Sequence, residues 1–135
     1  MTAENRRKIL LVDDDKFFLK VISDAFTGAG FDVVTAEDGV DGVEAYASQD
    51  FDAVILDLVM PRMGGVSASL EITRLSKEPD PIIIMLTSFF QGAPHEHPIP
   101  EMGAKVHIPK STPPLDIVII VEQLLERRRR GTGAA

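Results

Sequence analysis

The chain has 135 residues, a formal net charge of −7 and 44% hydrophobic residues, so it can bury one hydrophobic core and is too apolar to be disordered. It contains no cysteine, which excludes disulfide bonds, thiolate chemistry and cysteine-ligated zinc. The negative charge argues against direct binding to DNA, because such binding depends on Lys and Arg neutralising phosphates. No apolar run approaches the length of a transmembrane helix or of a signal peptide. We therefore expect a cytoplasmic protein that does not bind membranes.

Apolar runs of strand length alternate along the chain with segments of helical spacing. A run at residues 9–12 precedes a helical pattern over residues 18–29, which stops at Gly30. Residues 33 and 34 indicate a short second strand. Residues 40–47 then form a second helical pattern.

The second half of the chain continues the alternation. A strand at residues 53–56 is followed by a helix that opens at Gly64 and Gly65. Apolar runs at residues 82–86 and 106–109 predict the fourth and fifth strands. A last helix is expected over residues 115–129, since prolines just before it suit a first helical turn.

A fourth helix is due between the last two strands, but the sequence disfavours it. Pro94, Pro98 and Pro100 fall inside residues 89–102. Each proline removes a helical donor and clashes with the preceding turn, at a cost of roughly 3 kcal/mol in a helix interior. We expect a proline-rich loop to replace or shorten this helix.

Strands that alternate with helices imply right-handed crossovers and a parallel sheet covered on both faces. We predict an α/β fold, a flavodoxin-like, doubly wound, five-stranded parallel sheet with strand order 2-1-3-4-5. Residues 1–7 would form an N-terminal lead, residues 8–130 the single domain, and residues 131–135 a flexible tail.

Polar side chains follow four of the five predicted strands at the point where each strand ends. Because the carboxyl ends of parallel strands share one edge of the sheet, these side chains should converge there. They are Asp13, Asp14, Asp57, Thr87, Ser88 and Lys110.

This set has a definite chemistry. Clustered carboxylates repel each other by about 1 to 4 kcal/mol per pair near a surface, and a divalent cation relieves that repulsion. Oxygen ligands favour Mg²⁺ or Mn²⁺ over zinc. Lys110 supplies a positive charge for phosphoryl oxygens, Thr87 supplies a hydroxyl, and an aspartate can itself act as the nucleophile.

Each residue alone has a simpler interpretation. An isolated Asp after a strand is more often a helix N-cap, and Asp15 fits that role because a helix starts just after it. An isolated strand-end Lys is usually a solvated charge. The complete set, in order after separate strands, is much harder to attribute to chance.

Four segments, at residues 12–15, 56–65, 86–88 and 103–110, resemble the receiver domain of bacterial two-component response regulators, of the single-domain chemotaxis-regulator type. The resemblance spans residues 8–127. It implies a Mg²⁺ (or Mn²⁺) site and a phosphorylation-dependent switch.

By this resemblance, Asp57 would accept a phosphoryl group from a histidine kinase or phosphotransfer protein. Asp13, Asp14, Asp57 and the backbone carbonyl of Val59 would hold the metal. The phosphoryl-binding and switch residues would be Thr87, Ser88, Lys110 and His107.

The sequence also departs from the family pattern. Ser111 stands where a proline usually follows the lysine, and Gly64 stands where an aspartate is frequent. His107 replaces an aromatic residue that swings inward on activation; it could act similarly or be a half-buried histidine on an edge strand. Val59 and Phe89 would flank the pocket with apolar groups, which predicts a long-lived acyl phosphate.

The last helix carries two apolar stripes. One stripe is expected to pack on the sheet and contains Leu115, Val118, Val121 and Leu125. The second, formed by Ile117, Ile120 and Leu124, is a candidate face for a downstream partner or a second copy of the chain, or is covered by the proline-rich segment. The arginines at residues 127–130 fit a helix C-terminus better than a binding site for nucleic acid.

The sequence therefore predicts a stand-alone receiver that is regulatory and is not an enzyme beyond its own phosphorylation and dephosphorylation. Phosphorylation of Asp57 would switch protein–protein interactions. The alternative is a docking module that kept the fold and works without phosphorylation. A phosphohydrolase is disfavoured, because no general acid follows Asp57 at the second position and no cap domain is present.

Overall fold

The computed structural model describes residues 6–88 and 106–133. The expected proline-rich loop and Phe89 lie outside these residues, as does most of the N-terminal lead. Five strands form one parallel sheet in the order β2-β1-β3-β4-β5, which confirms the predicted topology. The strands are β1 (Lys8–Val12), β2 (Asp32–Ala36), β3 (Ala53–Asp57), β4 (Ile83–Thr87) and β5 (Val106–Pro109).

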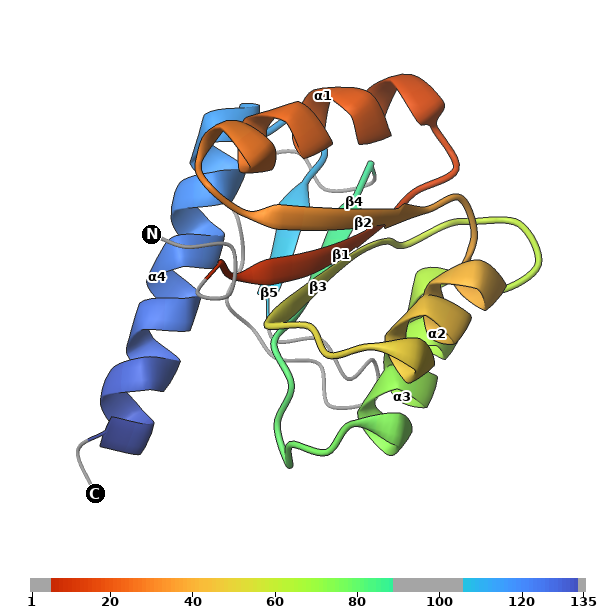
Figure 1. The fold of residues 1–135 in the computed structure, drawn as a ribbon. Helices are drawn as coiled ribbons and strands as arrows, with labels where there is room; N and C mark the ends of the chain where they lie inside the picture. Colours follow the sequence, from red (N-terminus) through yellow and green to blue (C-terminus); the bar gives the residue numbers. More distant parts are fainter. Residues whose placement is uncertain (1–5, 89–105, 134–135) are drawn as a thin grey trace.

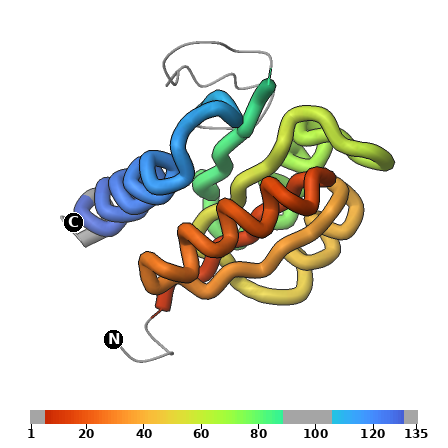
Figure 2. The backbone as a smooth tube through the Cα atoms, turned by 90° about the horizontal axis from the view of Figure 1, so that it is seen from above, coloured from red at the N-terminus to blue at the C-terminus, as the bar shows by residue number. Residues whose placement is uncertain are grey.

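Helices cover both faces of this sheet (Figure 1). The described helices are α1 (Lys16–Gly28), α2 (Gly39–Ser48), α3 (Gly65–Leu75) and α4 (Pro114–Gly133). Helices α1 and α4 lie on one face, and α2 and α3 lie side by side on the other. Figure 2 shows the same arrangement from above, with α4 on the far side of the sheet from the α2–α3 pair.

Alternation along the strands creates two hydrophobic cores. Ile9 and Leu11 of β1 pack with α1 and α4, whereas Leu10 and Val12 pack with α2 and α3. Successive side chains of a strand point to opposite faces, so a strand covered on both sides must be apolar throughout. The uninterrupted apolar runs seen in the sequence therefore have a direct structural cause.

Helix α4 faces the sheet differently from our expectation. Ile117 is fully buried, while Ile120 and Leu124 are half-buried and pack against the same core as α1. Leu115, which was expected to pack on the sheet, is 68% exposed. Ile119 is also exposed, at 49%. Ile117 therefore cannot belong to a partner face, because the two apolar stripes adjoin and are largely buried together.

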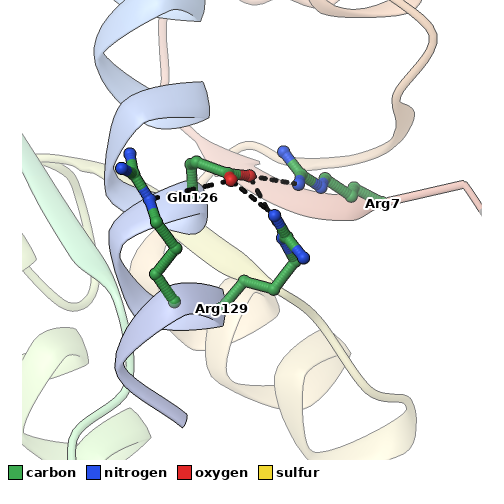
Figure 3. A network of polar contacts seen from close by, with 4 residues as sticks. Arg7, Glu126 and Arg129 are labelled. Atoms are coloured by element: carbon green, nitrogen blue, oxygen red, sulfur yellow. Dashed lines mark hydrogen bonds and ion pairs between the residues drawn. The ribbon is translucent and has the colours of Figure 1, made fainter. Parts of the chain in front are cut away.

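Helix α4 also runs to Gly133, beyond Arg129 and into the predicted tail. Glu126 lies within ion-pair distance of Arg129 (2.6 Å) and Arg130 (3.8 Å), one turn further along the helix. Such pairs support the last turns of a helix. Figure 3 shows Arg7, the residue before β1, beside the same carboxylate, and the two groups lie 3.8 Å apart. These arginines thus have acidic neighbours within the fold.

No described helix, in residues 6–88 or 106–133, is both long and apolar enough to cross a membrane.

Two glycines in helices allow a matched test of packing on the sheet. A Cβ added at Gly42 of α2 would lie 2.8 Å from Cγ2 of Val12, whereas Gly28 of α1 has nothing within 4 Å. We expect Gly42→Ala to lower the free energy of unfolding by about 1 to 3 kcal/mol through overpacking. Gly28→Ala should raise it by up to about 1 kcal/mol through helix propensity.

Urea denaturation followed by circular dichroism measures both variants. Equal effects of the two substitutions would contradict the close packing of α2 on β1.

Candidate functional site

The strand-end side chains predicted from the sequence do converge at one edge of the sheet. Asp13 and Asp14 follow β1, Asp57 ends β3, Thr87 ends β4 and Lys110 follows β5. The parallel strands are paired so that their carboxyl ends are aligned: Val12 pairs with Leu56, Asp57 with Leu86, and Thr87 with Pro109.

The three neighbouring aspartates after β1 have different roles. The Asp15 carboxylate accepts hydrogen bonds from the backbone N–H groups of Phe17 (3.0 Å) and Phe18 (3.1 Å), and so caps α1. Asp13 Oδ1 accepts one from the backbone N–H of Asp15 (2.9 Å). Asp14 is exposed. The N-cap role expected for Asp15 is confirmed, which leaves Asp13 and Asp14 for the site.

Asp13, Asp14 and Asp57 form a compact acidic cluster. Each residue offers a carboxylate oxygen, and these oxygens lie within 4.8 Å of one another. Asp13 is fully buried and Asp57 is 6% exposed, whereas Asp14 faces solvent. The cluster is thus open on the Asp14 side and closed beneath.

Lys110 is the cation that faces this cluster. Its Nζ lies 2.8 Å from Oδ2 of Asp13 and 3.9 Å from Oδ1 of Asp57. The ammonium also lies 4.5 Å from the centre of the Phe18 ring, within the range of a cation–π contact. Its backbone N–H donates to the Thr87 carbonyl at 2.9 Å, which ties β5 to the end of β4.

Burial and mutual repulsion raise the pKa values of the two buried carboxyls. Burial, followed by the charge of Asp13, raises the pKa of Asp57 from 3.8 to about 6, although Lys110 opposes this. Burial also raises the pKa of Asp13 against the hydrogen bond from Lys110. Partial burial lowers the pKa of Lys110, but Asp13 and Asp57 outweigh that effect and raise it.

The donor set of the cluster fits a hard divalent cation. Three carboxylates and one ammonium leave an excess of negative charge in a partly buried place, and oxygen ligands favour Mg²⁺ or Mn²⁺. The raised pKa of Asp57, caused first by burial and then by the charge of Asp13, agrees with a site that favours neutralisation of this carboxylate. The side chains present therefore suit the metal expected from the sequence.

Close backbone packing positions the segment after Asp57. The N–H of Leu58 donates to the Leu86 carbonyl and the N–H of Gly65 donates to the Leu58 carbonyl, both at 2.9 Å. A Cβ at Gly65 would lie 2.4 Å from the Asp57 carbonyl oxygen, so only glycine fits there. Val59 is 60% exposed, while Met60 is buried.

The expected switch residues lie at the ends of β4 and β5. Thr87 is fully buried and Ser88 is exposed. One expectation from the sequence was a half-buried His107. The residue is in fact buried, with 4% of its surface exposed. It pairs in register with Met85, whereas Val106 and Ile108 on either side point to the α1–α4 core. His107 thus lies on the opposite face of β5.

Two features of the site were not found from the sequence. One is the Phe18 ring beside Lys110. The other is a contact of Arg62, in the loop after β3, with Asp38, the N-cap of α2, and with Asp41 in the first turn of that helix. Neither has a sequence signal, because each depends on how two separate elements are placed in space.

Comparisons with known proteins agree with this fold. The response regulator receiver domain family matches residues 9–122. A protein-glutamate methylesterase/protein-glutamine glutaminase from Oleidesulfovibrio alaskensis is 37% identical over 135 residues, covering 93% of this chain and 36% of that protein. The chemotaxis protein CheY of Treponema pallidum is 41% identical over 80 residues, covering 57% of this chain and 56% of that protein.

Solved structures show the same architecture. A CheY-like receiver domain protein from Methanospirillum hungatei superimposes with a TM-score of 0.81 at 21% identity, covering 94% of this chain and 99% of that chain, which is a likeness of fold alone. CheY in a CheX–CheY–BeF₃–Mg²⁺ complex from Borrelia burgdorferi gives a TM-score of 0.75 at 28% identity, covering 87% and 88%.

The chain belongs to the response regulator receiver domain family of two-component signalling. The receiver domain is the regulatory part of these systems. The chain spans 36% of the methylesterase and 52% of a probable transcriptional regulator from Cyanophora paradoxa, so the matches concern the receiver region of longer proteins.

The raised pKa of Asp57 leads to a prediction for stability. The folded protein keeps a proton on Asp57 up to about pH 6, whereas the unfolded chain releases it near pH 3.8. Metal-free wild-type protein should therefore lose stability relative to Asp57→Asn as pH rises from 4 to 6. At pH 8 the variant should be more stable by about 1 to 3 kcal/mol, and below pH 4 the difference should vanish.

Urea denaturation in the presence of a chelator, between pH 4 and 8, measures this difference. Asp24→Asn is the matched control, since Asp24 is exposed on α1 and pairs with Lys20. A variant at Asp57 that is no more stable than wild type at pH 8 would show that the three carboxylates do not destabilise the fold.

Proposed function

We propose that this chain is a phosphorylation-controlled receiver in which Asp57 accepts a phosphoryl group in a Mg²⁺-dependent reaction. The observation that carries the proposal is the placement of Asp57: its carboxylate lies between two further carboxylates and the Lys110 ammonium. With a pKa of about 6, the group is mostly ionised at neutral pH and can act as a nucleophile.

In the proposed reaction a carboxylate oxygen of Asp57 attacks the phosphorus atom of the donor. The bond from phosphorus to the donor nitrogen or oxygen breaks, and the leaving group keeps that electron pair. Lys110, 3.9 Å from Asp57 Oδ1, can pair with a phosphoryl oxygen of the resulting acyl phosphate. The Thr87 hydroxyl and Ser88, at the end of β4, are the other candidates for phosphoryl contacts.

Asp13, Asp14, Asp57 and the Val59 carbonyl would hold Mg²⁺ or Mn²⁺ beside the acceptor. The bound ion would offset the charge that accumulates on the phosphoryl oxygens. Asp13 already pairs with Lys110, so it is suited to help through a water molecule. Asp14, the exposed member, is suited to direct contact.

A switch would begin at Thr87. Because the N–H of Lys110 donates to the Thr87 carbonyl, a shift of Thr87 toward a phosphoryl group would also move the start of the segment after β5. His107 lies on that strand, and its burial supports a role in coupling the site to the surface. The acyl phosphate is expected to be long-lived, given the apolar Val59 at the site.

The signal would pass through other proteins. We propose that a histidine kinase or a phosphotransfer protein donates the phosphoryl group. The phosphorylated chain would then bind a protein target or a second copy of itself. Both steps would take place in the cytoplasm. CheY of Borrelia burgdorferi, a similar structure, is described in complex with CheX and BeF₃, which supports a protein partner. No enzymatic activity beyond self-phosphorylation and dephosphorylation is proposed.

Intact-protein mass after incubation with acetyl phosphate tests the proposal. Wild-type protein should gain one phosphoryl mass when Mg²⁺ is present and none with a chelator. Asp57→Asn should gain none, while Asp24→Asn should behave as wild type. These outcomes follow from Asp57 being the nucleophile and from the acidic cluster needing a cation.

A folded wild-type protein that gains no phosphoryl mass would contradict the proposal. It would favour the alternative, a docking module that binds its partners without phosphorylation. Equal phosphorylation of Asp57→Asn and wild type would place the acceptor at another residue.

A further inference from the structure

The loop between β3 and α3, residues 58–64, is anchored at its ends but not by the packing of Val59. Backbone hydrogen bonds join Leu58 to Leu86 and Gly65 to Leu58. Val59 itself is 60% exposed. Met60 is buried and Met63 packs against the same core, so a further contact of this loop would add to the position that these two residues set.

Arg62, in the middle of the loop, makes such a contact. Its Nε donates to Oδ2 of Asp38 at 2.8 Å, and a terminal nitrogen donates to Oδ1 of Asp41 at 2.9 Å. The pair stays ionised, since the hydrogen bond from Arg62 lowers the pKa of Asp38. The planar guanidinium thus joins the loop to the first turn of α2 through two separate carboxylates.

The backbone at Arg62 has an unusual conformation. Its φ is 64°, the one positive φ of a non-glycine residue in the described ranges. An L-residue adopts this left-handed conformation against a steric penalty, and surrounding contacts must hold it there. Across Arg62 the N–H of Met63 donates to the Pro61 carbonyl at 2.7 Å, and the two ion pairs to α2 add to this local hydrogen bond.

The start of α2 is a firm support for this loop. Asp38 caps the helix by accepting from the Asp41 N–H at 2.8 Å, and its side chain is only 13% exposed. A Cβ at Gly39 would lie 2.1 Å from the Met63 carbonyl oxygen, so helix and loop touch through their backbones. Arg62 therefore bridges surfaces that are already in close contact.

The same end of α2 also contacts the strand that carries Asp13 and Asp14. The N–H of Asp13 donates to the carbonyl of Ala36, which ends β2 just before α2. Gly42 packs against Val12, the last residue of β1. The start of α2 thus connects the two segments that would supply the metal ligands.

We propose that Arg62 is a positioning residue, which together with the buried Met60 holds the loop at Val59 beside the acidic cluster and thereby raises the affinity for Mg²⁺. This inference rests on the proposed function, because it concerns the same metal site. Arg62 contacts neither the metal ligands nor the acceptor in the described structure. It acts through the backbone of the loop.

Arg62→Gly is the most informative variant, because glycine adopts the left-handed backbone without strain and removes the side chain with its guanidinium. We expect Mg²⁺ binding, measured by isothermal titration calorimetry, to weaken roughly threefold to tenfold. Backbone amides of residues 58–64 should exchange hydrogen faster in the metal-free variant. Arg74→Ala, which removes an exposed ion pair with Glu71 on α3, is the control of equal charge change and should alter neither quantity.

Asp38→Asn provides the second arm of the test. Asparagine caps a helix as well as aspartate does, so α2 should persist while one charged partner of Arg62 is lost. This variant should weaken Mg²⁺ binding in the wild-type background and have little further effect in Arg62→Gly. Independent, additive effects of the two substitutions would overturn the proposal.

The outcomes separate this inference from the proposed function. If wild-type protein binds Mg²⁺ but is not phosphorylated, the function fails, and the effect of Arg62→Gly on binding still decides the positioning role. Unchanged Mg²⁺ affinity and unchanged amide exchange in Arg62→Gly would overturn the inference even if Asp57 is phosphorylated.

Discussion

Three carboxylates crowd into one corner of the sheet, and their repulsion must be offset by something else in the fold. At separations below 4.8 Å the repulsion is on the order of 1 to 4 kcal/mol per pair. Lys110 offsets part of it through contacts with Asp13 and Asp57. Burial, followed by the remaining repulsion from Asp13, raises the pKa of Asp57 to about 6, so the ionised carboxylate destabilises the metal-free fold at neutral pH.

The rest of the architecture keeps these charges from moving apart. Apolar strands packed on both faces fix the ends of β1 and β3, because a one-residue shift would exchange the two cores. Asp15 closes the first turn of α1, and the close approach at Gly65 fixes the backbone at Asp57. The site is therefore already organised before it binds a cation, or a cation together with a phosphoryl group.

Much of this could be predicted from the sequence, for a physical reason. Buried parallel strands need continuous apolar runs, and their ends share an edge, so Asp57 and Lys110 could be assigned to one site without a structure. Contacts between separate elements could not be predicted, as with Phe18 and Arg62. The predicted orientation of α4 was partly wrong. The spacing of apolar residues in the sequence identifies such a helix, but it does not show which of several apolar faces is buried, as the exposed Leu115 illustrates.

Proton release on Mg²⁺ binding measures directly whether the cation replaces a proton on Asp57. Isothermal titration in buffers of different ionisation enthalpy should show about half a proton released per Mg²⁺ at pH 6, where Asp57 is half protonated, and almost none at pH 8. Asp57→Asn should lose most of the release at pH 6. Mg²⁺ binding without proton release at pH 6 would contradict a cluster in which the cation replaces the proton that repulsion and burial hold on Asp57.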